Sequence, residues 1–321
     1  MSPRGGHDRP RRSGQRLGLL VNPVAGRGKA RRAGRGVEEL LAASGHSVVD
    51  LSGATPTEAR HRAESAVGSG DVDALIVVGG DGVVNLGANA VLGHDPHVPL
   101  GIVPAGSGND AARGLRIPVG DVEAAVGVLL AALHAPRAID AVEVERPTVP
   151  GRRWYVGVLS AGFDAAVNER ANRMRRLRGR ARYAAAVLGE LRRFRGYTFA
   201  LEVDGARSEL AGTLVSVANG TAIGGGMRIA PGADLTDGLL DVVTADRVSR
   251  RELLRIFPRV YAGTHVDHDA VHVVHARSVL LDVGPGVSPL APPPIAHADG
   301  EPIGALPLRA TVRPGALRVL A

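Results

Sequence analysis

The 321-residue chain contains no cysteine, which excludes disulfide bonds, thiolate nucleophiles and cysteine-ligated zinc sites. Aromatic residues make up only 3% of the sequence, which argues against a protein that stacks nucleic-acid bases on many aromatic rings. Long hydrophobic runs are lacking too, since no stretch approaches the roughly 20 apolar residues of a membrane-spanning helix. We therefore expect a globular, cytoplasmic protein, with peripheral contact at the inner face of the membrane left open.

The charge of the chain is positive and comes almost wholly from arginine. The formal net charge is +7, and Lys29 is the only lysine among 39 basic residues. An arginine guanidinium binds phosphate through two parallel hydrogen bonds, so this composition suits nucleotides, nucleic acid or an anionic membrane. Because aromatic residues are scarce, we expect no nucleic-acid partner.

The length of the chain is sufficient for two domains of ordinary size. Residues 1–15 are rich in arginine and are predicted to form a disordered basic tail. Residues 16–137 alternate apolar runs with amphipathic stretches, which is typical of a parallel α/β sheet, and form the first predicted domain. Its predicted strands are residues 17–21, 47–51, 74–78 and 100–103, and its predicted helices are residues 30–44, 56–67, 84–92, 109–115 and 122–133.

Residues 138–321 are predicted to form a second, β-rich domain. One helical interval, residues 165–195, carries ten arginines and is broken near Gly179. The proline-rich residues 283–294 are expected to form an irregular surface loop. The predicted strands of this domain are residues 138–144, 154–160, 197–203, 210–217 and 239–244.

Glycine-rich loops follow three predicted strands of the first domain, at the strand ends where open parallel sheets bind ligands. The first loop runs from Asn22 through Gly26 to Lys29. Its glycines allow close backbone approach, and the helix that follows offers free N–H groups to an anion. The spacing matches neither the P-loop nor the dinucleotide-binding pattern, so an ordinary turn between strand and helix stays an alternative.

The other two loops place polar side chains among glycines. Asp81 stands between glycines directly after a strand, where its carboxylate can serve a metal ion or a ligand hydroxyl. Ser107, Asn109 and Asp110 follow the next strand, and either Ser107 or Asn109 can instead act as a helix N-cap. The recurrence of such loops at neighbouring strand ends favours one shared binding site.

Taken in order, these loops resemble the diacylglycerol kinase catalytic domain that bacterial lipid kinases share with diacylglycerol, ceramide and sphingosine kinases. In the first half the resemblance rests on Asn-Pro-x-x-Gly from Asn22, Gly-Gly-Asp-Gly from Gly79 and Gly-Ser-Gly-Asn-Asp from Gly106. In the second half it rests on Gly162-Phe163-Asp164, Ile229-Ala230-Pro231, Asp237-Gly238-Leu239-Leu240-Asp241 and Asp299-Gly300-Glu301. The fold it implies is an α/β N-terminal domain similar to NAD kinases and phosphofructokinases, followed by a β-rich, β-sandwich-like domain.

The resemblance implies an ATP- and Mg²⁺-dependent lipid kinase that binds its nucleotide between the two domains. The γ-phosphoryl group would go to a lipid hydroxyl, and diacylglycerol, giving phosphatidic acid, is the favoured acceptor. The family's general base maps onto Glu301, with Asp299 as its supporting neighbour, and Asp81 supplies a further carboxylate. The implied partner is a lipid at an anionic membrane surface, and the prediction leaves room for a homodimer.

The implied nucleotide contacts and metal ligands are carried over by their position in the motifs. A structural Mg²⁺ site maps onto Asp234, Asp237 and the backbone carbonyl of Leu239. The predicted nucleotide site consists of Asn22, Gly26, Ser52, Gly79, Gly80, Asp81, Gly82, Val83, Asn85, Gly106, Ser107 and Asn109.

Two positions depart from the family's pattern. Val83 stands where a threonine is usual, and Leu86 stands where an acidic residue is usual. A lost hydroxyl removes one hydrogen bond, worth about 0.5–1.5 kcal/mol if its partner is neutral. These departures keep open a catalytically weakened homologue that binds nucleotide or membrane. A small-molecule kinase of the NAD kinase type is a further alternative, because it would share the Gly-Gly-Asp-Gly element.

A cluster of histidines and a run of arginines each allow two interpretations. The histidines at positions 265, 268, 272 and 275 fit a strand with polar outward positions better than a metal site. The arginine run between Arg170 and Arg195 fits either a solvated helical face or a surface that docks on an anionic bilayer.

Overall fold

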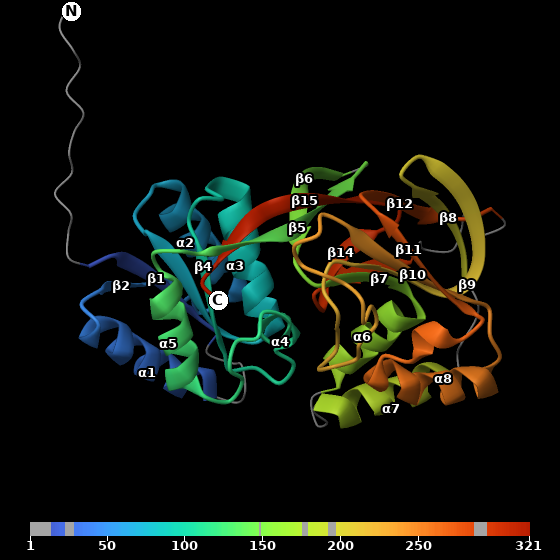
Figure 1. The fold of residues 1–321 in the computed structure, drawn as a ribbon, viewed down its shortest axis with the longest axis horizontal. Helices are drawn as coiled ribbons and strands as arrows, with labels where there is room; N and C mark the ends of the chain where they lie inside the picture. The colour runs from blue at the N-terminus through green and yellow to red at the C-terminus, as the bar shows by residue number, and fades with distance from the viewer. Residues whose placement is uncertain (1–13, 23–28, 148, 175–178, 192–196, 286–293) are drawn as a thin grey trace, which may run out of the picture.

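The computed structural model describes residues 14–22, 29–147, 149–174, 179–191, 197–285 and 294–321 (Figure 1). Gly26, almost all of the predicted tail, parts of the arginine-rich interval and most of the proline-rich loop lie outside these residues. Within them, no helix is both long enough and apolar enough to cross a membrane.

The first half is a parallel sheet covered by helices. Its strands are ordered β4-β3-β1-β2, and every residue of β3 and β4 is buried because helices cover both faces. Each predicted strand and helix of this half is confirmed, with ends that move by a few residues. The strands are β1 (Arg16–Val21), β2 (Ser47–Asp50), β3 (Ala74–Gly79) and β4 (Leu100–Pro104), and the helices are α1 (Lys29–Ala43), α2 (Pro56–Gly68), α3 (Asp81–His94), α4 (Asp110–Gly114) and α5 (Val122–Ala132).

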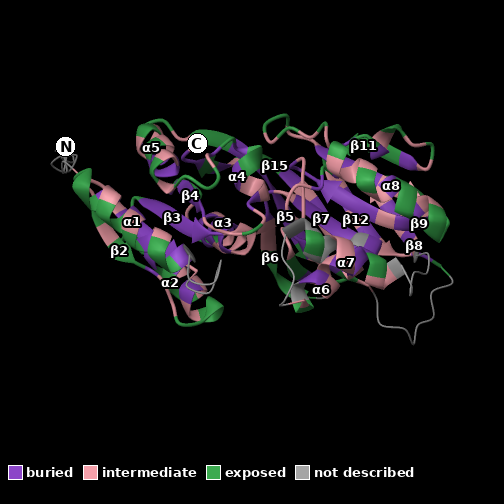
Figure 2. Ribbon diagram, turned by 90° about the horizontal axis from the view of Figure 1, so that it is seen from below, coloured by how far each residue is buried: buried purple, intermediate pink, exposed green. Residues whose placement is uncertain are grey.

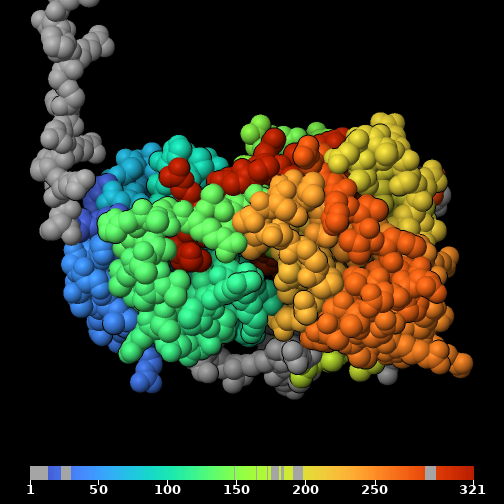
Figure 3. All heavy atoms as spheres, viewed as in Figure 1, coloured from blue at the N-terminus to red at the C-terminus, as the bar shows by residue number. Residues whose placement is uncertain are grey.

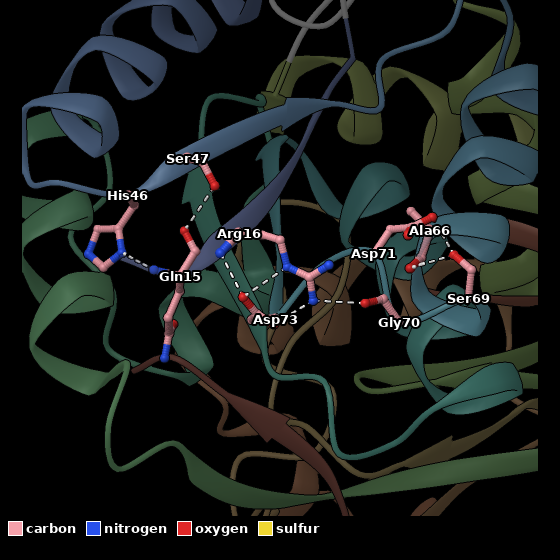
Figure 4. Close-up of polar contacts among 9 residues, drawn as sticks. All are labelled: Gln15, Arg16, His46, Ser47, Ala66, Ser69, Gly70, Asp71 and Asp73. Carbon is pink, nitrogen blue, oxygen red and sulfur yellow. Dashed lines mark hydrogen bonds and ion pairs between the residues drawn. The ribbon is translucent and has the colours of Figure 1, made fainter. Parts of the chain in front are cut away.

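Polar contacts fix the end of the parallel sheet at which β1 begins (Figure 4). The backbone N–H of Arg16 donates to Oδ2 of Asp73 at 2.7 Å, and its guanidinium donates to Oδ1 at 2.9 Å. The same guanidinium donates to the carbonyl of Gly70 at 2.8 Å. These bonds hold β1 against the segment that leads into β3, and so set the register of the strand whose far end carries Asn22.

The second half is built from antiparallel strands with helices α6, α7 and α8 packed together on one side (Figure 1). The prediction of one strand over residues 154–160 is wrong, because the chain forms two strands there with a break at Val156 and Gly157. The helices are α6 (Phe163–Arg173), α7 (Gly179–Leu191) and α8 (Arg250–Ala262). The strands are β6 (Val149–Tyr155), β7 (Val158–Gly162), β8 (Tyr197–Val203), β9 (Ala206–Ala218), β10 (Leu240–Asp246), β11 (Val271–Ala276), β12 (Ser278–Val283), β13 (Ile295–Ala298) and β14 (Glu301–Ala305).

Two long strands join the halves. β5 (Arg137–Arg146) pairs antiparallel with β15 (Leu308–Val319), and β15 also touches β4 at Leu100. The buried side chains of Leu317, Val319 and Leu320 belong to the core of the first half, although they end the chain. The described strands thus form one continuous sheet whose buried residues run through both halves (Figure 2). The predicted fold class is confirmed, whereas the division of the chain near residue 138 stays a proposal.

Candidate active site

A cavity of about 320 Å³ lies between the two halves. In Figure 3 the teal residues around α4 meet the orange loop that precedes β10 along this seam. The strand ends of the first half and the turn from β13 to β14 of the second half both reach the cavity. Of the residues that the sequence predicts for the site, Asn22, Gly80, Asp81, Gly82, Val83, Gly106, Ser107, Asp299 and Glu301 line it.

The first turn of α3 faces the cavity with its backbone. Gly80 is the N-cap and has no side chain to satisfy the N–H groups that follow. Among the described residues, the N–H groups of Asp81 and Gly82 have no acceptor. The positive end of this 14-residue helix therefore points at the cavity and favours an anion.

Asp81 and Asn109 hold the two glycine-rich loops together. The carboxylate of Asp81 accepts hydrogen bonds from the N–H of Asn109 at 2.8 Å and of Ala111 at 3.2 Å. Asn109 has a left-handed backbone with φ of +60°, and its buried amide both accepts from and donates to the backbone of Gly106. The alternative of a helix N-cap is met in part: Asn109 stands at the N-cap position of α4, but its side chain caps no N–H of that helix and closes its own loop instead.

Asp299 joins the two halves beneath the turn that carries Glu301. Its carboxylate accepts from the N–H groups of Val156 and Gly157 at 3.0 and 2.8 Å, and from the amide of Asn85 at 3.2 Å. Burial raises the pKa of Asp299 and the charge of Asp81 adds to this effect, while the hydrogen bonds lower it. These bonds take the backbone N–H groups that a continuous strand would use, which is why β6 ends before β7 begins.

Glu301 lies against the first turn of α3. A Cβ placed on Gly82 would come within 2.8 Å of Oε1 of Glu301. The glutamate is exposed to the cavity, so its carboxylate can accept a proton from a bound group beside the helix terminus. Glycine at position 82 is what allows this approach.

Asp110 is a site residue that the sequence prediction did not select. Its carboxylate lines the cavity and accepts from the N–H of Gly225, 115 residues away in the second half, at 2.7 Å. Burial, followed by the charge of Asp81, raises the pKa of Asp110 to about 6. The glycine run 224–226 was the available signal, since all three residues have positive φ, a conformation that glycine adopts without strain.

The remaining predicted nucleotide contacts do not line the cavity. Ser52 accepts from the N–H of Val21 at 3.0 Å, and Asn85 ties Asp299 to the carbonyl of Trp154. Gly79 and Asn109 are buried, and Gly26 lies outside the described residues. Val83 lines the cavity but is only 4% exposed, with its methyl groups packed toward Gly79.

The predicted metal ligands lie on one exposed loop before β10. One carboxylate oxygen of Asp234 accepts from Thr236, and one of Asp237 accepts from the N–H of Leu239. Within the described residues, no three acidic, histidine or cysteine side chains are grouped for a metal ion. The two aspartates supply the oxygen donors that Mg²⁺ prefers, but a third ligand would have to be a carbonyl or water.

A second, smaller cavity of about 100 Å³ lies in the second half of the chain, next to the cavity between the two halves. Its walls come mainly from apolar side chains of α6, α7, α8, β9 and β10, including Val187, Leu253 and Ile256. The two cavities share Asn168, Ile223, Gly224 and Gly300. An apolar chain bound in the smaller cavity would therefore present its polar end beside Gly300 and Glu301.

Comparisons with known proteins match both halves. The family model of the diacylglycerol kinase catalytic domain matches residues 16–144, and that of the YegS C-terminal NAD kinase beta sandwich-like domain matches residues 157–321. A diacylglycerol kinase of Mycobacterium tuberculosis is 38% identical over 302 residues, which are 94% of this chain and 93% of that protein. A diacylglycerol kinase of Bacillus subtilis is 23% identical over 296 residues, 91% of this chain and 92% of that protein.

The same arrangement of elements occurs in a solved structure. A crystal structure of a diacylglycerol kinase from Bacillus anthracis superposes with a TM-score of 0.69 at 18% identity, covering 95% of this chain and 96% of that one. At this level of identity the match establishes the fold.

Proposed function

This chain belongs to the diacylglycerol kinase family, and from that membership we propose that it transfers the γ-phosphoryl group of ATP to a lipid hydroxyl, with diacylglycerol as the preferred acceptor. The observation that carries the proposal is the position of Glu301. Its carboxylate lies beside the N-terminus of α3, in a cavity that continues into an apolar pocket.

The phosphates of the nucleotide would bind at the first turn of α3. The N–H groups of Asp81 and Gly82 lie there without a partner among the described residues. The glycines at 106 and 108 let the neighbouring loop pack against this turn, because a Cβ on either would meet Gly80 or Asp81. Exposed Ser107 adds a hydroxyl donor at the same wall. Ser52 is a weaker candidate for nucleotide contact, because its hydroxyl already accepts from β1.

Asp81 and Asp110 are the carboxylates that would hold Mg²⁺ beside the phosphates. Both line the cavity. Burial, followed by the charge of Asp81, raises the pKa of Asp110 despite the ion pair with Arg113 at 3.4 Å, and a divalent cation would relieve the repulsion between the two aspartates. The ion would neutralise charge that develops on the phosphates during transfer. A second, structural ion at Asp234, Asp237 and the carbonyl of Leu239 remains part of the proposal.

In the transfer step Glu301 accepts the proton of the lipid hydroxyl. The hydroxyl oxygen forms a bond to the γ-phosphorus while the bond from that phosphorus to the β–γ bridging oxygen breaks, and ADP leaves. The proton then passes from Glu301 to solvent. Asp299 does not touch the reacting atoms; its hydrogen bonds to Val156 and Gly157 fix the turn from which Glu301 extends.

The apolar pocket gives the proposal its acceptor class. Hydrocarbon from the lipid would fill the space between α6, α7 and α8, while the hydroxyl stays at Gly300. Burial lowers the pKa of His265 and of His297, two histidines in the pocket wall, so both stay neutral near pH 7. A neutral pocket suits the uncharged glycerol esters better than a lipid with a free ammonium group.

The outer side of the same helices would dock on an anionic membrane. Arg250, Arg251 and Arg255 are exposed on α8, and beside them Leu254 is 46% exposed. Within the predicted arginine run, Arg170 and Arg173 pair with Glu190 and Glu169, so they contribute less free charge. Each basic residue near an anionic surface adds about 1 kcal/mol of attraction.

Sedimentation with vesicles tests the docking surface. The parent should pellet with anionic vesicles and not with neutral ones, and replacing Arg250, Arg251 and Arg255 by glutamine should abolish the difference. Equal binding to both vesicle types, unaffected by salt, would remove electrostatic docking from the account.

A lipid panel tests the acceptor. Purified protein is incubated with labelled ATP, Mg²⁺ and mixed micelles of diacylglycerol, monoacylglycerol, ceramide or a sphingoid base, and the labelled lipid is identified. We expect phosphatidic acid as the main product. Ile223 lies where the two cavities meet, so Ile223→Trp should raise the KM for lipid and leave the KM for ATP unchanged.

Val49→Trp serves as the control for that variant, because Val49 is exposed on β2 away from both cavities. Labelling of no lipid by the parent would reject the kinase assignment. A second candidate function, a weakened homologue that binds nucleotide without transfer, is favoured by Val83, whose buried methyl groups replace the usual hydroxyl. Binding of ATP together with an absence of labelled lipid would select it.

A further inference from the structure

Three arginines converge outside the cavity, and none of them has an ion-pair partner among the described residues. Arg60 lies on α2, Arg146 ends β5 and Arg153 lies on β6. In both ribbon views α2 and β6 flank α3 on the same side of the molecule (Figures 1 and 2). Within the described part of the chain, none of the three forms an ion pair, whereas Arg62 on the same helix pairs with Glu58.

The ladder between β5 and β6 brings two of these arginines close together in the sequence of pairs. Arg153 stands opposite Val144 and shares its face, and Arg146 follows Val144 by two residues, at a register irregularity that begins after Glu145. Their neighbours Glu143 and Arg152 pair with each other, and this pair belongs to the opposite face. The guanidinium of Arg146 also donates to the carbonyl of Ile303 at 3.2 Å, which brings β14 to the cluster.

Two of the three guanidinium groups contain a buried N–H donor that has no acceptor among the described residues. The Nε atoms of Arg60 and Arg146 are shielded from solvent and have no hydrogen-bond partner among the described residues. The surroundings are also positive: burial, then the charges of Arg60 and Arg146, lower the pKa of Arg153, and only Glu64 opposes them. Three guanidinium groups without ion pairs repel one another, so their proximity destabilises the fold unless an anion binds between them.

We propose that Arg60, Arg146 and Arg153 form a binding site for a phosphate group, separate from the cavity between the two halves. Buried guanidinium donors that lack acceptors match the several oxygens of a phosphate, which Arg binds in a bidentate manner. A bound phosphate would link α2 in the first half to β14, the strand that begins at Glu301. The phosphate belongs either to a free phosphorylated molecule or to the headgroup of an anionic lipid.

Inorganic phosphate and hydrogen exchange provide the first test. Amide exchange is measured on the full chain in phosphate and in chloride of equal ionic strength. We expect phosphate to slow exchange in α2 and β14 together, and we expect this protection to disappear in Arg60→Gln and in Arg153→Gln. Arg137→Gln is the matched control, because Arg137 starts β5 and is exposed.

Equilibrium dialysis with labelled phosphate measures affinity. Loss of one charged donor should weaken the triad-dependent binding by about tenfold. These substitutions should not change the binding of phosphate in the cavity between the halves. The tenfold loss therefore refers only to the phosphate binding that Arg60, Arg146 and Arg153 contribute. In chloride, the melting temperature of either variant should equal or exceed that of the parent, since one of three repelling charges is gone; if one variant fails to fold, the other carries the test.

Vesicles distinguish the two sources of the phosphate. Binding to vesicles of phosphatidylglycerol in phosphatidylcholine is compared with binding to phosphatidylcholine alone. Triad-dependent vesicle binding without binding of inorganic phosphate identifies a lipid headgroup, and the reverse identifies a free phosphorylated molecule. If Arg60→Gln and Arg153→Gln match the parent in hydrogen exchange, dialysis and vesicle binding, there is no such site.

Discussion

Gly82 allows Glu301 to lie on the first turn of α3, so this glycine controls the proposed base without taking part in the chemistry. In Gly82→Ala the new Cβ would lie 2.8 Å from Oε1 of Glu301, and the carboxylate would have to move. We expect kcat to fall by about 10²-fold, the effect of a displacement near 1 Å, with stability unchanged to within about 1 kcal/mol.

The control for this variant is on the same helix. Gly93→Ala adds a Cβ that meets nothing within 4 Å, so it should leave kcat unchanged and should not destabilise α3. Steady-state kinetics and urea denaturation of both variants provide the comparison. A Gly82→Ala enzyme as active as Gly93→Ala would show that Glu301 does not need its present position.

Asp110 should make stability depend on pH. Its pKa is raised to about 6 from 3.8, so the folded state holds the proton more tightly than the unfolded state. The contribution of protonated Asp110 to the free energy of unfolding is therefore fully present below pH 3.8 and is lost as the pH rises to about 6. Asp110→Asn should remove that slope and be more stable at pH 8, by roughly 3 kcal/mol at most since each pKa unit is about 1.4 kcal/mol. Urea denaturation across this pH range measures it, and identical pH profiles for parent and variant would contradict it.

At the residue scale, the sequence identified side chains more reliably than their partners. Asp81, Asp299 and Glu301 do line one cavity, although their motifs lie more than 200 residues apart. The bond from Gly225 to Asp110 could not be anticipated as a pair, because the glycine run 224–226 indicates a tight turn but not the residue that the turn contacts. The same holds for the three arginines, whose proximity depends on how α2 and β6 both pack against α3.

At the scale of elements, the loop that ends β4 depends on Asn109. Asn109→Ala would lose both hydrogen bonds to Gly106 and would force alanine into a left-handed backbone. We expect a cost of about 2–4 kcal/mol, from lost hydrogen bonds and from strain. Asn109→Gly keeps the backbone free, so it should cost about 1–2 kcal/mol less. Urea denaturation compares the two, and equal stability would show that the left-handed geometry is unimportant.

The strands and helices of the first half follow from periodicity, because buried parallel strands read as unbroken apolar runs. The same rule failed at residues 154–160. That run looks like one strand, but the N–H groups of Val156 and Gly157 donate to the carboxylate of Asp299 and interrupt the ladder. The interruption depends on a residue 142 positions away from Gly157, which no local pattern contains.

At the scale of the whole molecule, β15 makes the halves depend on each other. Its last residues fill the core of the first half, and Leu317, Val319 and Leu320 are each only 1% exposed. Urea unfolding should therefore give one transition with the same midpoint by the fluorescence of Trp154 and by far-UV circular dichroism. Two separated midpoints would show that the halves unfold independently.

Deletion of residues 317–321 tests the same dependence by mutation. Burial of each of the three large side chains is worth roughly 1.5–3 kcal/mol, so the loss approaches the 5–15 kcal/mol that stabilises a typical protein. We expect the truncated chain to lose its cooperative transition. The sequence placed these residues in the second domain, since only the completed sheet shows that they return to the first.

The central claim is that Glu301 accepts the proton of the lipid hydroxyl beside the N-terminus of α3. Single-turnover transfer from labelled ATP to diacylglycerol, compared between the parent and Glu301→Gln, tests it most directly. Glutamine keeps the shape and removes the base, so the account predicts a rate about 10²–10⁴-fold lower with ATP affinity unchanged. A variant that transfers phosphate at a rate close to that of the parent would contradict the account.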